Sequence, residues 1–204
     1  MEPLNRLPTP EEMPEPLASL LREHEHTAQV IADARDTLDG TDLRSASPQS
    51  AARVVQVARD LQQFLAHDLT LHIAKEEEVL FPAMRDLADH MEDLLVHMVA
   101  QHDEIRARQD LIDRTMAALD AHRNEVEVER DAFIADVSRM TEALTPEVLA
   151  DLRERAMRLE RILLGHFAEE EEDLFIPARA LIAPEVLQVL DEQMATLARM
   201  GPPA

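Results

Sequence analysis

The chain has 204 residues and carries 42 Asp and Glu against 20 Lys and Arg, a formal net charge of −22. Its length suits one large domain or two small ones, and a hydrophobic content of 46% is too high for a wholly disordered chain. The negative charge repels phosphate backbones and argues against nucleic-acid binding. The absence of Cys, Tyr and Trp excludes disulfides, thiolate metal sites, iron–sulfur clusters and Tyr or Trp radicals.

Sequence signals for export, membrane insertion and nucleotide binding are missing. The N-terminal region lacks a basic segment followed by an apolar run, and no stretch reaches the roughly 20 apolar residues that span a bilayer. We therefore expect a soluble, cytoplasmic protein with no membrane partner. Only three glycines occur, and there is no dinucleotide, P-loop or serine-hydrolase motif. The prediction is an all-α protein, because few turns are available for strands.

The first elements in chain order are a tail and two amphipathic helices. Residues 1–13 are proline-rich and predict a disordered tail. One helix is expected over residues 16–39, ended by Gly40, and another from Pro48 to about Pro82, with Ser47 as its N-cap. The expected inward faces comprise Leu17, Leu20, Leu21, His24, Ala28, Ile31 and Leu38, then Val54, Ala58, Leu61, Leu65, His72, Glu76 and Leu80.

A third helix is expected from Ala88, with Leu94, Met98, His102, Ile105, Ile112 and Met116 on its inward face. Unbroken to Leu144, it would run roughly 60 Å past His102, about twice the distance that the returning helix can retrace. We therefore predict a break near residues 122–124, and an extra helical segment over residues 126–144 outside the basic bundle.

The fourth helix is predicted to begin at Thr145-Pro146, again a cap followed by proline. A last short helix from Pro184 is expected to bury Val186, Leu187, Leu190, Met194 and Leu197. The expected organisation is a tail over residues 1–13, an up-down four-helix bundle over residues 14–183, and a C-terminal helix and tail over residues 184–204.

Helical phase separates the nine histidines into classes. At about 100° per residue, positions i and i+4 share a face, whereas offsets of two and five do not. One histidine falls on the apolar face of each long helix: His24, His72, His102 and His166. His26, His67 and His97 are out of phase with these and are expected to face solvent, while His90 and His122 lie near predicted helix ends.

Two of the inward histidines begin a repeated string. HIAKEEEVLF from His72 and HFAEEEEDLF from His166 are identical at seven of ten positions. In each copy Glu76 or Glu170 follows its histidine by one turn on the same face. The next two glutamates are rotated from the histidine by about 140° and 240°, so we expect them to point to solvent or to helix boundaries.

Buried carboxylates facing four imidazoles imply a metal, because an unpaired buried carboxylate is strongly unfavourable. Imidazole and carboxylate donors suit iron or manganese. Two carboxylates can bridge a pair of ions inside a four-helix bundle. Asp68, one turn before His72, is either a hydrogen-bond partner for an imidazole or a partly exposed bundle residue.

The duplicated H-x-x-x-E-E-E-x-L-F string, with Leu-Leu-Arg-Glu-His24 before it and Gln-His102-Asp-Glu-Ile between the copies, resembles the hemerythrin-like HHE cation-binding domain. The resemblance covers about residues 14–182 and implies an up-down four-helix bundle around two non-haem iron ions. It implies that His24 and His72 bind one iron, that His102 and His166 bind the other, and that Glu76 and Glu170 bridge them, together with an oxo or hydroxo bridge.

Compared with oxygen-carrying hemerythrins, the chain lacks a fifth histidine, since Met98 and Arg106 occupy the positions four from His102. The four-His, two-Glu set is closer to the repair-of-iron-centres group. Two irons offer about twelve coordination positions, of which about two stay open after four imidazoles, two bridging carboxylates and one oxygen bridge. We therefore expect reaction with hydrogen peroxide, nitric oxide or oxygen in stress defence, with peroxide or nitric oxide turnover favoured.

Other interpretations remain at this point. Reversible oxygen binding or sensing, and iron donation or storage, use the same residues, so enzymatic activity is not fixed by the sequence. A ferritin-like di-iron protein would use Glu-x-x-His twice, whereas the chain has it once, from Glu23 to His26. The oligomeric state is equally open between monomer and dimer.

Overall fold

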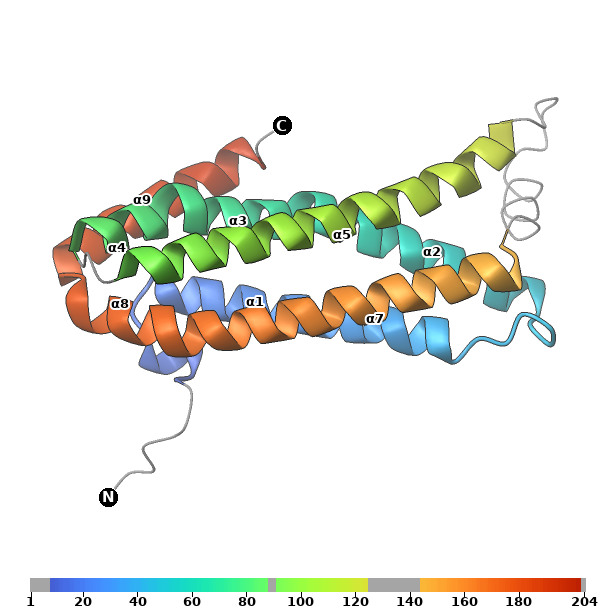
Figure 1. Ribbon diagram of the computed structural model, residues 1–204, viewed down its shortest axis with the longest axis horizontal. Coiled ribbons are helices and arrows are strands. Elements are labelled where there is room, and N and C mark those ends of the chain that lie inside the picture. The colour runs from blue at the N-terminus through green and yellow to red at the C-terminus, as the bar shows by residue number, and fades with distance from the viewer. Residues whose placement is uncertain (1–7, 88–90, 125–143, 203–204) are drawn as a thin grey trace, which may run out of the picture. The chain divides into compact units, whose positions relative to one another are not determined.

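The computed structural model describes residues 8–87, 91–124 and 144–202. Within these ranges the regular structure is helical and contains no strand, which confirms the all-α prediction. The helices are α1 (Leu17–Asp39), α2 (Pro48–Phe64), α3 (Thr70–Lys75), α4 (Phe81–Leu87), α5 (Glu92–Asn124), α7 (Pro146–Glu169), α8 (Ile176–Leu181) and α9 (Pro184–Met200) (Figure 1). None of these described helices has the length and apolarity to cross a membrane.

Two helices begin as the cap signals predict. The Ser50 amide donates to Ser47 Oγ at 3.1 Å at the start of α2, and the Val148 amide donates to Thr145 Oγ1 at 3.3 Å at the start of α7. Each cap satisfies a backbone N–H that has no partner inside the helix. The prolines that follow the caps occupy first-turn positions, where no N–H is required.

The second predicted helix is longer than expected, because it passes through Pro82 and ends at Leu87. The run contains α2, α3 and α4, separated by π-helical turns at Leu65–Leu69 and Glu76–Leu80. Just before the proline, the Phe81 amide donates to the Glu76 carbonyl, an i→i+5 bond. This widened turn relieves the clash between a proline ring and the preceding turn. The second repeat behaves alike, with a π segment at Glu170–Phe175 before Pro177.

Other boundaries differ modestly from expectation. The third predicted helix, α5, runs from Glu92 to Asn124. The described residues stop at Asn124, so the break predicted near residues 122–124 stays a prediction. The extra helix predicted for residues 126–144 lies, except for its last residue, outside the described residues, as do residues 1–7 of the predicted tail. At the inner end of that tail, Pro10–Glu12 forms a 3-10 turn and Met13 is buried.

The chain divides into two compact units, and α1, α5 and α7 contribute residues to both. Unit 1 comprises residues 1–28, 67–104 and 162–204, and unit 2 comprises residues 29–66 and 105–161. The unit 1 core joins side chains from every segment of that unit; it includes Leu17, Leu20, Leu80, Phe81, Met84, Leu95, Met98, Leu174, Phe175, Leu187, Leu190 and Met194. Within unit 1, α9 lies against α3 and the Glu76–Leu80 turn (Figure 1).

The predicted face of α9 needs one correction, since Val186 is exposed while Leu187, Leu190 and Met194 are buried. The buried residues follow a spacing of three and four, and Val186 is out of phase with them. In unit 2, the Arg153 Nε donates to the Leu38 carbonyl at 2.7 Å, which satisfies a carbonyl at the end of α1. Gln62 donates to Asp113 at 2.9 Å in the same unit and ties α2 to α5.

Candidate metal centre

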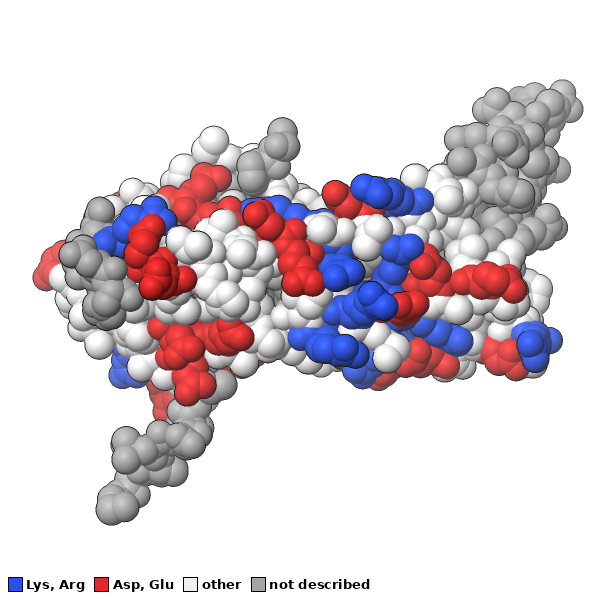
Figure 2. Space-filling view, viewed as in Figure 1, with Lys and Arg blue, Asp and Glu red and all other residues white. Residues whose placement is uncertain are grey.

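Acidic side chains form several separate patches on the face shown in Figure 2, and among the described residues only Glu76 and Glu170 are buried carboxylates. Both are 0% exposed, and both begin a π-helical turn. The four inward histidines predicted from helical phase are also buried and share unit 1 with these glutamates: His24 on α1, His72 on α3, His102 on α5 and His166 on α7.

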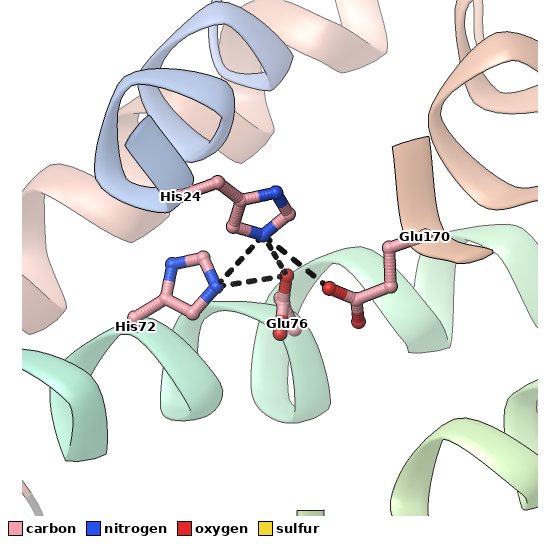
Figure 3. A group of neighbouring side chains, drawn as sticks. All are labelled: His24, His72, Glu76 and Glu170. Atoms are coloured by element: carbon pink, nitrogen blue, oxygen red, sulfur yellow. Dashed lines mark hydrogen bonds and ion pairs between the residues drawn. The ribbon is translucent and has the colours of Figure 1, made fainter. Parts of the chain in front are cut away.

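His24 and His72 form the first sub-site together with one oxygen of each glutamate (Figure 3). His72 Nε2 lies 3.3 Å from Glu76 Oε1, and His24 Nε2 lies 3.4 Å from Glu170 Oε2. The two imidazole Nε2 atoms are 3.2 Å apart. All the donor atoms of this group fall within 4.8 Å of one another, a spacing that suits a single ion.

His102 and His166 form the second sub-site with the remaining carboxylate oxygens. His102 Nε2 lies 3.2 Å from Glu76 Oε2, and His166 Nε2 lies 3.3 Å from Glu170 Oε1. Each carboxylate therefore presents one oxygen to the first sub-site and the other oxygen to the second. The structure thus brings together all six residues that the sequence predicts as metal ligands.

Several atoms of this cluster are buried without a hydrogen-bond partner: both carboxylate oxygens of Glu76, both of Glu170, and the Nε2 atoms of His102 and His166. Leaving such groups unpaired costs about 1–3 kcal/mol each, and more when they are charged. Their arrangement in two adjoining groups fits a pair of cations, which would satisfy every one of them.

Mutual burial also shifts the proton affinities of the cluster. Burial, reinforced by the charge of Glu76, raises the pKa of Glu170 to about 8. Burial is the largest effect on His166 as well, and together with the nearby His102 it lowers the pKa of that imidazole to about 4. Without a cation, one carboxylate therefore tends to hold a proton, because two buried anions repel each other.

Each of the four imidazoles has a side-chain partner at Nδ1, on the side of the ring away from the carboxylate pair. His24 pairs with Glu171 at 2.8 Å and His72 with Glu23 at 2.9 Å. His102 pairs with Glu77 at 2.9 Å and His166 with Gln101 at 2.7 Å. An ionised carboxylate only accepts, so the imidazole donates from Nδ1 and its Nε2 keeps a free lone pair.

Two of these partners correct the sequence-based expectation, because Glu77 and Glu171 do not point to solvent but lie half-buried against His102 and His24. The expectation assumed uninterrupted α-helical phase. Both residues lie in π turns, where i→i+5 bonding rotates a residue five positions after the histidine back toward the inward face. Their duplication next to Glu76 and Glu170 is the signal that points to them.

Glu23 was also missed, and it takes the place considered for Asp68, whose side chain is 59% exposed. Glu23 contacts both His72 and the buried Lys75. Although burial raises its pKa, the hydrogen bond from His72 and the Lys75 ammonium lower it to about 2. The carboxylate behind His72 therefore stays ionised over the whole physiological range.

The remaining histidines agree with the phase prediction where their side chains are described. His26, His67 and His97 are exposed, whereas His90 and the side chain of His122 lie outside the described residues. Three phenylalanines pack against the imidazoles of His24 and His102. Phe167 and Phe175 both stack on His24, with ring centroids 3.9 and 5.4 Å from it, and Phe81 stacks on His102 at 5.7 Å. The first and last of these stacks restrict water around the centre and fix the ring planes.

Comparison with known families gives one match. A family model described as the hemerythrin HHE cation-binding domain matches residues 15–143, more than half of the chain. The matched range contains His24, His72, Glu76 and His102, while His166 and Glu170 join them through the repeat and the tertiary structure. No curated protein matches the chain.

Proposed function

Since the chain belongs to the hemerythrin HHE cation-binding family, we propose that it holds two non-haem iron ions and reacts with small oxidants. His24 and His72 would hold one ion and His102 and His166 the other, with the carboxylates of Glu76 and Glu170 shared between the two groups. The observation that carries the proposal is the pair of buried four-residue groups that share both carboxylates.

The donor set matches iron in kind as well as in place. The family binds metal, typically iron, and four neutral imidazoles with two carboxylates are donors that suit this ion. Two bridging carboxylates contribute two negative charges, so a pair of divalent or trivalent cations leaves a net positive centre. That centre attracts anionic or polarisable ligands such as peroxide and nitric oxide.

When bound, the two irons supply redox chemistry and open coordination positions. The chain's own residues govern access to these positions. Met98 is fully buried at the position four before His102, and Arg106 lies four after it, so neither offers an imidazole. With four imidazoles and two carboxylates, an open position on each ion is expected, and a ligand can then reach both ions at once.

Turnover of hydrogen peroxide or nitric oxide therefore fits the residues better than stable oxygen carriage. The sequence contains no Cys, Tyr or Trp that an oxidant would damage. Phe167, Phe175 and Phe81 line the imidazoles with side chains that carry no exchangeable proton. Reversible oxygen binding or sensing is the second candidate function, because the same centre and the same phenylalanine side chains around it would also serve that function.

The experiment combines metal analysis with optical spectroscopy of the purified full chain. We expect close to two irons per chain. The diferric protein is then mixed with hydrogen peroxide, and the diferrous protein with oxygen and with nitric oxide, while product and spectrum are followed. Consumption of peroxide or nitric oxide that is lost in His72→Ala supports the proposal. A long-lived oxygen adduct that releases oxygen under vacuum, without consumption of either oxidant, supports the second candidate instead.

A further inference from the structure

The partners of the six predicted ligands repeat with an internal two-fold pattern. His72, Glu76 and Glu77 in the first repeat correspond to His166, Glu170 and Glu171 in the second. The helices that complete the cluster correspond too, since His24 pairs with Glu171 as His102 pairs with Glu77. His24 and His102 are the inward histidines that lie outside the repeats. The residue immediately before each of them, Glu23 or Gln101, accepts a hydrogen bond from the histidine of a repeat, His72 or His166.

The pattern is broken at that last position, where Glu23 stands in one half and Gln101 in the other. Of the four side chains that contact an imidazole Nδ1, three are carboxylates and Gln101 is an amide. The neighbouring residues differ in the same way. Lys75 in the first repeat corresponds to Glu169 in the second, and each contacts the residue that breaks the pattern.

These neighbours fix how each acceptor is presented. Gln101 Nε2 donates to Glu169 Oε2 at 2.8 Å, which leaves Oε1 to accept from His166 at 2.7 Å. On the other side, one oxygen of Glu23 contacts Lys75 Nζ and the other accepts from His72. Lys75, the only lysine in the sequence, is 9% exposed, so the ion pair is largely shielded from solvent on the side of its ammonium group.

We infer that the two sub-sites are inequivalent and load in order, the His24–His72 sub-site first and the His102–His166 sub-site second. The inference rests on the proposed two-ion centre and adds its internal order. A carboxylate behind a metal-binding histidine makes the imidazole a stronger donor, and loss of such a partner typically costs 10–100-fold in metal affinity. The first sub-site has this support at both imidazoles, whereas the second has it at His102 alone.

The outer charges modify this difference without reversing it. Lys75 offsets part of the charge of Glu23, but it contacts the oxygen that faces away from His72. Glu169 is 45% exposed, so solvent weakens the effect of its charge on the second sub-site without abolishing it. The bond made directly to the imidazole is the stronger influence, because a charge-assisted hydrogen bond is about twice as strong as a neutral one.

The test is a titration of the metal-free full chain with Co²⁺, followed by calorimetry and by the visible spectrum. Two steps that differ by about 10–100-fold in affinity are expected. His24→Ala and His102→Ala identify them, because these histidines occupy equivalent positions in the two halves. His102→Ala should keep the tight step and lose the weak one, and His24→Ala should lose the tight step. Equal affinities in the unaltered chain, or the reverse assignment, would overturn the inference.

A second variant pair tests the named residues. Gln101→Glu combined with Glu169→Lys reproduces the arrangement of Glu23 and Lys75 in the second half, and should bring the two steps to within a few-fold. Glu23→Gln should reduce the difference in affinity between the two binding steps, because it weakens the tight step. If the difference in affinity between the two steps is unchanged in both variants, while helix content and thermal unfolding are retained, the inference is also overturned.

These outcomes are separate from those of the proposed function. Ordered loading without reaction toward any oxidant would remove the proposed reactivity and leave the order intact. Reaction with peroxide or nitric oxide by a protein whose two metal-binding steps have equal affinity would support the proposed function and overturn the loading order.

Discussion

His24 Nε2 and His72 Nε2 face each other at 3.2 Å, while the opposite nitrogen of each ring contacts a glutamate. With both rings neutral and donating from Nδ1, two lone pairs would meet across this gap. Burial and the neighbouring His72 lower the pKa of His24 well below its usual value. For His72 burial acts in the same direction, but Glu76 and Glu23 raise its pKa overall. Of the two rings, His72 therefore holds a proton more readily than His24, and a cation between them would meet both lone pairs.

The first prediction concerns the protons that the metal-free cluster holds. In the metal-free protein at pH 7, Glu170, with a pKa of about 8, and His102 hold protons that a metal must displace. Burial alone would lower the pKa of His102, but the nearby carboxylates of Glu170, Glu76 and Glu77 raise it to about 11. Metal affinity should therefore rise as pH increases from 6 to 8. Calorimetry in buffers of different ionisation enthalpy should show net proton release, and a pH-independent affinity would contradict the prediction.

The stability of the metal-free protein should show the opposite pH dependence. The folded pKa of Glu170 is about 8 against an ordinary value of 4.5, and that of His102 is about 11 against 6.5. Both raised values favour the folded state at low pH, and the contribution is lost as the unfolded chain releases its protons. The free energy of unfolding should therefore fall between about pH 6.5 and 8, the window that both shifts share. Urea unfolding at several pH values measures this, and a rise across the window would contradict it.

Metal removal should lower the melting temperature markedly. The folded chain presents two complete donor groups, whereas the unfolded chain presents separated residues, so metal binds the folded state preferentially. At a free metal concentration one hundred times the Kd, binding at one site adds about 2.7 kcal/mol. Thermal unfolding with and without a chelator tests this. Identical transitions would indicate that the six residues do not bind metal together.

Metal content should separate the inward from the outward histidines. His72→Ala and His166→Ala each remove a donor from a buried group and should lower iron content from about two to one or less per chain. His26→Ala and His67→Ala change exposed side chains and serve as matched controls with nearly unchanged iron. The measurement is iron per chain after purification. Similar losses in both classes would contradict the helical-phase assignment.

The glutamates that follow the bridging pair should affect metal affinity in spite of their partial exposure. Glu77→Gln and Glu171→Gln replace the carboxylate acceptors of His102 and His24, and should weaken binding 10–100-fold. Glu78→Gln and Glu172→Gln are the controls, because both side chains are exposed and each substitution removes the same charge. Competition with a metal indicator gives the affinities. If all four variants lose the same metal affinity, Glu77 and Glu171 act only through their negative charge and not through their hydrogen bonds to the imidazoles.

The helices and the inward-facing residues of the candidate centre could be predicted from the sequence alone. Apolar spacing, two cap-proline pairs and scarce glycine dictate helices, since these signals act within a few residues of chain. The same local logic placed His24, His72, His102 and His166 on inward faces, and the duplicated string identified Glu76 and Glu170. Once four helices each present one imidazole from an apolar face, a shared core brings the imidazoles together.

The residues that contact the imidazoles at Nδ1 could be identified only from the folded chain. The phase rule assumes a uniform α-helix, whereas the π turns that begin at Glu76 and Glu170 rotate Glu77 and Glu171 toward their partners. Glu23 and Gln101 contact histidines 49 and 65 residues away in sequence. No local pattern encodes such pairings, because they depend on how neighbouring helices pack in register. The difference between the two sub-sites therefore became visible only in the folded chain.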